Sequence, residues 1–481
     1  MYTKGVLLSI YFITKIRDLL PNLRYTMCSA IIFGKSLIML YHLYDSMQAM
    51  LAPARLMAEA SKAALQNPMS PLSYHPAARS IAASAELFER TTRKFGRPEF
   101  GLPETTIDGK KVKVTEETID EKPFCTLTRF KRDTKRNDPK VLIVAPMSGH
   151  FATLLRGTVA ALLPNHDVYI TEWNDARLVS LSEGRFNLDD YVAYVMDYFK
   201  ILGENTHVMA VCQPAVPVFM AVAVMNAQND KNAPKSMTLM GGPIDPRVSK
   251  TAVTELAEDR PISWFEQNVV TNVPFYYPGS GRQVYPGFLQ LSGFMQMNLD
   301  RHVGSHLKFY QHLIQGDGED AQRHRKFYDE YMAVMDLTGE FYLQTVEMIF
   351  QKHLLPKGEM KWKDPVTGKL HAVDATKITK TALMTIEGEL DDISATGQTL
   401  AAHGLCKNLP ANMQYHHTQD GVGHYGIFNG RRWRDEIQPR IADFIRKVDK
   451  SKYTPIVKSI KVAKQYTATK KTKLKSVKKK K

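Results

Sequence analysis

Short apolar runs alternate along the chain with longer stretches that place apolar residues at helical spacing. Five short runs predict strands, at residues 141–144, 168–173, 208–211, 236–240 and 382–386, and the strand pattern occurs again at 413–418. Four longer stretches predict helices, at residues 154–163, 187–202, 215–228 and 433–448. Strands and helices that alternate at these distances predict an α/β fold with a mostly parallel sheet and crossover helices.

Two further strands are predicted ahead of these by period-two alternation. Val112 and Val114 alternate with polar residues, and after Pro123 the same holds for Cys125 and Leu127. Between residues 245 and 377 the rhythm changes to long helical stretches, such as 327–335 and 340–351, with aromatic and Pro-rich segments between them. This segment is predicted to be an insertion that forms a helical cap.

The N-terminal part is rich in Ala, Met and Leu, with apolar positions at helical spacing from Met47 to Ala60. Pro68, Pro71 and Pro76 break it into at least two helices. Apolar stripes on helices usually face a core, so we expect these positions to pack on the main domain. The alternative is an amphipathic surface that binds an apolar partner.

Charge is concentrated at the C-terminal end. The net charge is +15, of which 13 Lys residues between 450 and 481 supply +13, because no Arg, Asp or Glu occurs there. The rest of the chain is nearly neutral, which argues against a nucleic-acid-binding domain. The tail is expected to be disordered and solvated, and the alternative is an element that docks on an anionic surface.

The four cysteines, Cys28, Cys125, Cys212 and Cys406, are scattered without a Cys-x-x-Cys pair. This argues against a disulfide scaffold and a zinc site, and it fits a reducing cytoplasm. The apolar runs are too short for a transmembrane helix. Residues 1–38 form a leader of doubtful status, and the signal-peptide pattern in it is weak.

Cys212 is the candidate nucleophile. It follows the predicted strand at 208–211 and precedes a helix, which is the strand–turn–helix position of the nucleophile in α/β-hydrolases. Ala210 supplies the small residue two positions before it, whereas Pro214 replaces the usual small residue two positions after it. Proline fits the first turn of a helix, and a helix N-terminus favours a thiolate. A buried core cysteine is the alternative interpretation.

Two later loops supply an acid and a base in the order that this fold requires. Asp391 and Asp392 follow the strand at 382–386, and we choose Asp391 as the acid. His424 lies in a glycine-flanked loop after the strand at 413–418. Three such residues at the ends of three strands favour a Cys212–His424–Asp391 triad over three unrelated polar positions.

The expected chemistry is acyl transfer. His424 takes the proton of Cys212, Asp391 orients His424, and the thiolate attacks an ester carbonyl to give a thioester. The oxyanion hole is expected to use the backbone N–H of Gln213 and that of Met147 or Ser148, in the loop after the strand at 141–144. Water resolves the thioester, or a thiol such as coenzyme A does so.

Five segments resemble those of intracellular polyhydroxyalkanoate (poly-3-hydroxybutyrate) depolymerases. They lie at residues 211–217, 241–245, 284–288, 387–394 and 423–433, and the likeness runs from about Met39 to Val448. The resemblance implies Cys212, Asp391 and His424 as the triad and a cytoplasmic polyester granule as substrate, with no metal and no organic cofactor. Met39 is an alternative start of the chain.

The resulting division has six segments: the leader 1–38, an N-terminal helical segment 39–106, the first part of the α/β-hydrolase core 107–245, the cap insertion 246–378, the second part of the core 379–448, and the Lys-rich tail 449–481. Two rival functions share this pattern. A polyester synthase uses the same triad but usually has glycines on both sides of its cysteine. A non-catalytic granule-binding protein would use the helices of residues 47–92. The aromatic residues of the cap are candidates for polymer binding or for a packed core: Phe275, Tyr276, Tyr277, Tyr285 and Phe288.

Overall fold

The computed structural model describes residues 29–449, so the predicted tail after 449 and the leader up to residue 28 lie outside the described residues. Nine strands form the central sheet, in the order β1-β2-β3-β5-β4-β6-β7-β13-β14. β1, β2, β3 and β5 pair antiparallel, and the six strands from β5 to β14 pair in parallel. The predicted α/β fold with a mostly parallel sheet is confirmed.

The strands of the central sheet are β1 (Glu104–Ile107), β2 (Lys110–Lys122), β3 (Cys125–Arg132), β4 (Lys140–Val144), β5 (Asp167–Trp173), β6 (Thr206–Val211), β7 (Ser236–Met240), β13 (Ala382–Gly388) and β14 (Gln414–Gln419). The parallel strands are buried on both faces because helices cover the sheet on either side, which explains their continuous apolar runs.

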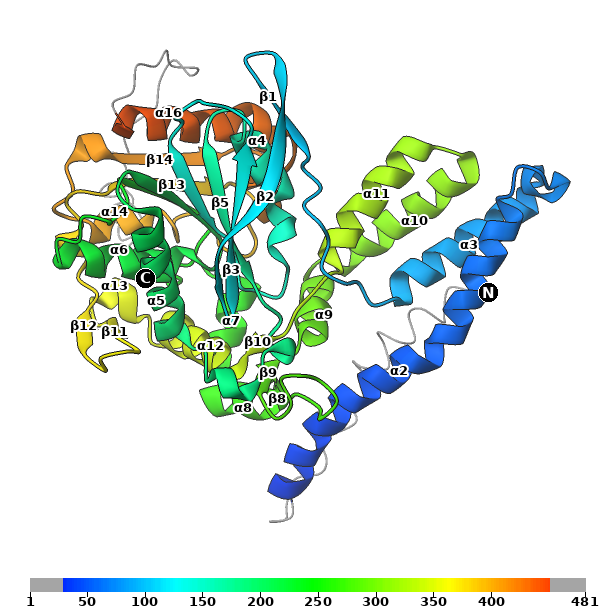
Figure 1. The fold of residues 1–481 in the computed structure, drawn as a ribbon. Helices are drawn as coiled ribbons and strands as arrows, with labels where there is room; N and C mark the ends of the chain where they lie inside the picture. The colour runs from blue at the N-terminus through cyan, green and yellow to red at the C-terminus, as the bar shows by residue number, and fades with distance from the viewer. Residues whose placement is uncertain (1–28, 450–481) are drawn as a thin grey trace, which may run out of the picture.

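Four main helices cover this sheet: α4 (Arg156–Leu162), α5 (Leu188–Leu202), α6 (Ala215–Ala227) and α16 (Gln438–Asp449). α5 packs against α6, and α16 packs against α4 (Figure 1). Every residue of α6 from Ala215 to Asn226 is buried, so this helix runs through the core directly behind β6. None of the described helices combines the length and apolarity needed to cross a membrane.

The segment between β7 and β13 contains most of the remaining elements. They are α7 (Ala252–Asp259), α8 (Ile262–Asn268), β8 (Thr271–Asn272), β9 (Gln283–Tyr285), α9 (Gly287–Met297), α10 (Leu299–Gln315), α11 (Gly318–Tyr331), β10 (Leu337–Thr338), α12 (Gly339–Gln344), a π-helix (Thr345–Gln351), α13 (Leu354–Lys357), β11 (Lys361–Lys363) and β12 (Leu370–Ala372). The predicted helix at 327–335 is wrong in its second half. Met335 donates its backbone N–H to Gly149 O, which ties this stretch to the loop after β4 instead of extending the helix.

Four helices project together from the sheet domain (Figure 1). α2 (Ser29–Leu65) packs against α3 (Pro76–Thr92), α3 against α10, and α10 against α11. We call these four helices the arm. The prolines at 68, 71 and 76 separate α2 from α3 as predicted, while Pro53 lies inside α2.

The expectation that the apolar stripe of α2 packs on the main domain is wrong. Met50, Leu56 and Met57 are 80%, 66% and 72% exposed. The side of α2 toward α3 is instead held by polar groups, since the Arg55 guanidinium donates to Thr92 O and the Lys62 ammonium lies 3.9 Å from the Glu86 carboxylate. Arg55 and Lys62 therefore face α3, whereas the large side chains of Met50, Leu56 and Met57 face solvent.

A buried polar network links Tyr41 of α2 to the cap. The Asp336 carboxylate accepts hydrogen bonds from the Tyr41 hydroxyl at 3.0 Å and from the Gly287 backbone N–H at 2.9 Å. The Asp336 N–H donates to Asp175, whose carboxylate pairs with Arg177. Burial, with the nearby Asp175 charge, raises the pKa of Asp336 to about 7.

This raised pKa predicts a component of stability that falls as the pH rises. The folded state holds the Asp336 proton more tightly than the unfolded state, so the contribution is fully present below pH 4 and is lost between about pH 4 and 7. Between pH 5 and 7.5, the free energy of unfolding of Asp336→Asn should increase by about 2 kcal/mol relative to that of the wild type, at 1.36 kcal/mol per pKa unit. Urea unfolding of both proteins at the two pH values measures this.

The exposed carboxylate variant Asp420→Asn is the control for this comparison. It should follow the wild type at both pH values. An equal stability difference between Asp336→Asn and the wild type at pH 5 and 7.5 would contradict the pH dependence assigned to Asp336.

Candidate active site

Cys212 occupies a sharp turn between β6 and α6. Its φ is +68°, in the left-handed region that non-glycine residues rarely adopt. The Cys212 N–H donates to Met240 O at 2.7 Å, which ties the turn to the neighbouring strand β7. A Cβ at Gly242 would lie 2.8 Å from Cys212 O and 2.1 Å from the Ala215 Cβ, so only glycine leaves room for this turn.

Asp391 and His424 meet beside this turn from the loops after β13 and β14. His424 Nδ1 lies 2.8 Å from Asp391 Oδ2, and both side chains are buried. The other oxygen, Oδ1, accepts the backbone N–H groups of Ile393 and Ser394 at 2.9 and 2.8 Å. The Asp391 carboxylate is therefore fixed on both sides, with one oxygen left for the imidazole.

The electrostatics of His424 link it to Cys212. Burial acts to lower the pKa of its imidazole, but the Cys212 sulfur and the Asp391 carboxylate outweigh this and hold the pKa well above its usual range. An imidazole beside a carboxylate can hold the proton that a nucleophilic cysteine releases.

Asp392, the neighbouring carboxylate, is exposed. It accepts a hydrogen bond from the Asn298 side chain at 3.3 Å, at the junction of α9 and α10. The structure therefore brings Asp391, and not Asp392, to the imidazole.

Two residues that support this site were not singled out from the sequence. The buried Glu387 carboxylate, at the end of β13, accepts backbone N–H groups of Gly397, Thr399 and Leu400 at 2.8 to 2.9 Å, and so shapes the segment that follows Asp391. Gly241 has φ +55°, and a Cβ there would lie 3.2 Å from His424 Cε1 and 3.3 Å from Asp391 Oδ2. Glu387 and Gly241 each stand at a strand's C-terminal end, which is the signal that could have found them.

The predicted oxyanion-hole residues lie next to one another. Met147 is buried and Ser148 half-buried in the loop after β4, which pairs directly with β6. The Met147 N–H points to Oε1 of the Gln213 side chain, at 3.4 Å. The Gln213 Nε2 is buried and has no hydrogen-bond partner among the described residues. The Gln213 side chain thus accepts a hydrogen bond from the Met147 backbone N–H, which was expected to face the substrate.

The cap reaches the site through aromatic contacts. Tyr425, next to His424, contacts Tyr331 at the end of α11, with ring centroids 6.0 Å apart. His150 donates its Nε2–H to Tyr331 O at 3.0 Å, and its ring contacts the Phe294 ring. The C-terminal end of α11, one of the arm helices, therefore lies against Tyr425 beside His424.

The cap aromatics divide into two groups. Tyr277 and Phe288 pack around Tyr41, and Tyr285 packs on Tyr342 at 4.2 Å between ring centroids. Phe275 is 83% exposed, and the half-exposed Tyr276 donates its hydroxyl to Asp45 of α2.

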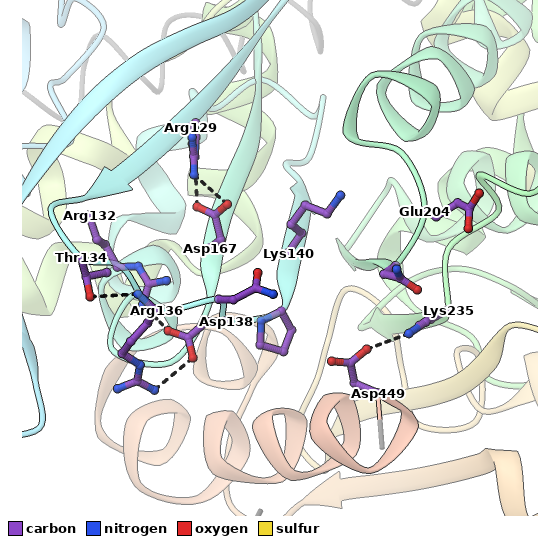
Figure 2. A pocket seen from close by; sticks show the side chains of 13 residues that line it. Arg129, Arg132, Thr134, Arg136, Asp138, Lys140, Asp167, Glu204, Lys235 and Asp449 are labelled. Carbon is purple, nitrogen blue, oxygen red and sulfur yellow. Dashed lines mark hydrogen bonds and ion pairs between the residues drawn. The ribbon is translucent and has the colours of Figure 1, made fainter. Parts of the chain in front are cut away.

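A separate pocket of about 530 Å³ opens at the opposite edge of the sheet, at the start of β4 and β5 (Figure 2). Its charges pair internally: Arg129 with Asp167, Arg136 with Asp138, and Lys235 with Asp449 (Figure 2). Cys212 follows the C-terminal end of β6, so this pocket is far from the candidate nucleophile.

Within residues 29–449, one group of side chains has the spacing of metal ligands, namely His312, Asp317 and Asp320. It lies at the turn between α10 and α11, and Arg323 already pairs with Asp320. It has no contact with the site at Cys212.

One known protein family is similar to the C-terminal half of the chain. The family model "PHB de-polymerase C-terminus" matches residues 241–449, which include Asp391 and His424. No curated protein sequence matches the chain. Among solved structures, a monoacylglycerol lipase from Paleococcus ferrophilus is 12% identical, with 65% of this chain and 96% of that chain covered and a TM-score of 0.37.

Two further solved structures are similar at the same level. A thermophilic esterase from Thermogutta terrifontis is 12% identical, with 72% and 97% of the two chains covered and a TM-score of 0.35. A meta-cleavage product hydrolase from Pseudomonas fluorescens IP01 is 12% identical, with 72% and 97% covered and a TM-score of 0.37. The assignment of the α/β-hydrolase fold rests on the parallel sheet and the strained Cys212 turn. Residues 241–449 of the chain therefore resemble the C-terminal domain of PHB depolymerases, and the chain has the α/β-hydrolase fold.

Proposed function

We propose that this chain is an intracellular depolymerase that cleaves the ester bonds of stored poly(3-hydroxybutyrate) or related polyhydroxyalkanoate granules. Cys212, His424 and Asp391 act as its catalytic triad. The observation that carries this proposal is the buried His424–Asp391 pair, which lies beside a cysteine held at φ +68°. The family match over residues 241–449 supplies the substrate class.

The geometry supports the following steps. His424 holds the proton released by Cys212, and the thiolate attacks the ester carbonyl carbon. The tetrahedral oxyanion receives hydrogen bonds from the backbone N–H groups of Gln213 and Met147. As the carbon–oxygen bond breaks, His424 returns its proton to the leaving hydroxyl oxygen. A thioester on Cys212 remains, and Asp391 keeps Nδ1 of His424 oriented throughout.

The second half of the cycle removes the acyl group. Water gives a proton to His424 and attacks the thioester, which releases a 3-hydroxyacid end and restores Cys212. Coenzyme A is the alternative acceptor and would release an acyl thioester. All these steps use side chains and backbone groups of the chain, so the proposal includes no metal and no resident cofactor.

Incubation of the purified protein with amorphous poly(3-hydroxybutyrate) particles tests this function. We expect release of 3-hydroxybutyrate monomer or oligomers, and a comparison with and without coenzyme A identifies the acceptor. In a parallel reaction, hydroxybutyryl-coenzyme A should not be polymerised. Polymer growth from that thioester would show a synthase, and no product from particles or soluble esters would refute the proposed function.

The side chain of Gln213 predicts a measurable effect on substrate binding. Its Oε1 accepts the Met147 N–H, so a substrate carbonyl must displace it to reach the proposed oxyanion hole. We expect Gln213→Ala to lower KM for a soluble ester about fivefold, in line with ~1 kcal/mol for one hydrogen bond. The kcat should stay within about twofold because the backbone donors remain.

Steady-state kinetics on a short hydroxybutyrate ester separates kcat from KM for this variant. A large fall in kcat with unchanged KM would mean that the Gln213 carboxamide assists the transition state. The displacement of this side chain by substrate would then be wrong.

A further inference from the structure

The arm carries an apolar surface that the proposed chemistry does not use. We call it the α2 face and define it as Leu43, Met50 and Met57, which are 57%, 80% and 72% exposed. Leu43, Met50 and Met57 are seven residues apart and so lie along one side of the helix. Over these 14 positions the row extends for about 20 Å at ~1.5 Å per residue.

The α2 face is almost free of charge. The Asp45 carboxylate forms an ion pair with Lys94 and accepts hydrogen bonds from the hydroxyl groups of Tyr276 and Tyr277. The Arg55 guanidinium donates hydrogen bonds to Gln48 and Thr92. Between Ser46 and Ala58 the exposed positions are otherwise small or apolar. A surface for an anionic membrane would present Lys or Arg around its apolar residues, and the α2 face does not.

Other exposed apolar side chains lie near both ends of the helix. Tyr276 contacts His42 and Asp45 of α2, and its neighbour Phe275 projects into solvent. At the other end, Met69 and Tyr74 in the α2–α3 connection are 88% and 65% exposed. Exposed apolar patches of this extent commonly mark an interaction site.

We infer that the α2 face adsorbs the enzyme to the surface of the uncharged polyester. This inference rests on the proposed function. A polyester of hydroxybutyrate offers methyl and methylene groups and no charge, which matches an uncharged apolar face. Methionine side chains are flexible and polarisable, so they adapt to a surface without fixed shape. Another helix of the arm reaches the site, because α11 ends at Tyr331 against Tyr425 beside His424.

A matched pair of variants tests the inference. Met50→Lys with Met57→Lys places two charges on the α2 face, and Lys has nearly the helix propensity of Met. Val366→Lys with Leu370→Lys places the same two charges on exposed apolar positions around β11 and β12. Each protein is sedimented with amorphous poly(3-hydroxybutyrate) particles and is assayed on a soluble hydroxybutyrate ester.

We expect the α2-face variant to lose at least tenfold in particle affinity, with soluble-ester turnover unchanged. The β11–β12 variant should match the wild type in both assays. Unchanged particle binding of the α2-face variant overturns the inference, even if the wild type hydrolyses the polymer. Binding of the wild type to phosphatidylcholine vesicles that equals its binding to particles would assign the face to a lipid surface. A wild-type dimer that becomes a monomer in the α2-face variant, without loss of particle binding, would assign the face to a second copy of the chain.

Discussion

Replacement of Cys212 by alanine is expected to reduce ester hydrolysis by at least about 10³-fold, which is the loss typical of removing one triad member. The Cys212 thiolate is the only group of the protein that forms a bond to the acyl carbon in the proposed mechanism. The positive φ at Cys212 persists with alanine, which removes one atom and adds none. Hydrolysis of a soluble hydroxybutyrate ester measures the loss without the complication of particle binding.

Cys406 provides the matched control. It is buried behind the sheet, and burial raises the pKa of its thiol to about 12, so its thiolate is scarcely populated at neutral pH. Cys406→Ala should retain the turnover of the wild type, at some cost in stability from the lost packing. Full activity in Cys212→Ala, or loss of activity in Cys406→Ala with the fold intact, would refute the assignment of Cys212 as nucleophile.

The centre of the sheet could be predicted because its parallel strands β4, β6, β7 and β13 are almost entirely buried. The apolar run at 208–211 is part of β6, and the run at 236–240 is β7. The position of Cys212 followed from the same signal, since a residue just after a buried parallel strand lies at the C-terminal edge of the sheet. The order of the residues along the chain predicted His424 and Asp391 as base and acid. Their 2.8 Å contact could be seen only in the structure.

Other features depend on tertiary contacts that leave no periodic signal. The stripe of α2 has the spacing of a buried helix face, yet α3 presents Thr92 and Glu86 to α2, and the polar side of the helix turned inward. The direction of the Gln213 carboxamide cannot be predicted from the sequence pattern either. The burial of Asp336 also leaves no sequence signal, because its partners Tyr41 and Gly287 are 295 and 49 residues away.

The adjacent carboxylates Asp391 and Asp392 give the second large effect. Asp391→Asn should lower kcat by about 10³- to 10⁴-fold, by analogy with the loss that asparagine causes at the acid of a serine protease triad. Asparagine keeps the shape and can still accept the N–H groups of Ile393 and Ser394 through its oxygen. Its amide would then face Nδ1 of His424, which favours the wrong tautomer and removes the charge that stabilises the imidazolium.

Asp392→Asn is the matched control, one residue away on an exposed side chain. It should retain activity within about twofold, since its contact is the Asn298 side chain and not the imidazole. The pH profile of kcat/KM adds a second readout: Asp391→Asn removes one of the two charges that raise the pKa of His424, so the protonated imidazole should be lost at lower pH than in the wild type. Equal losses in the two variants would mean that the loop after β13, and not the Asp391 carboxylate, is what the reaction requires.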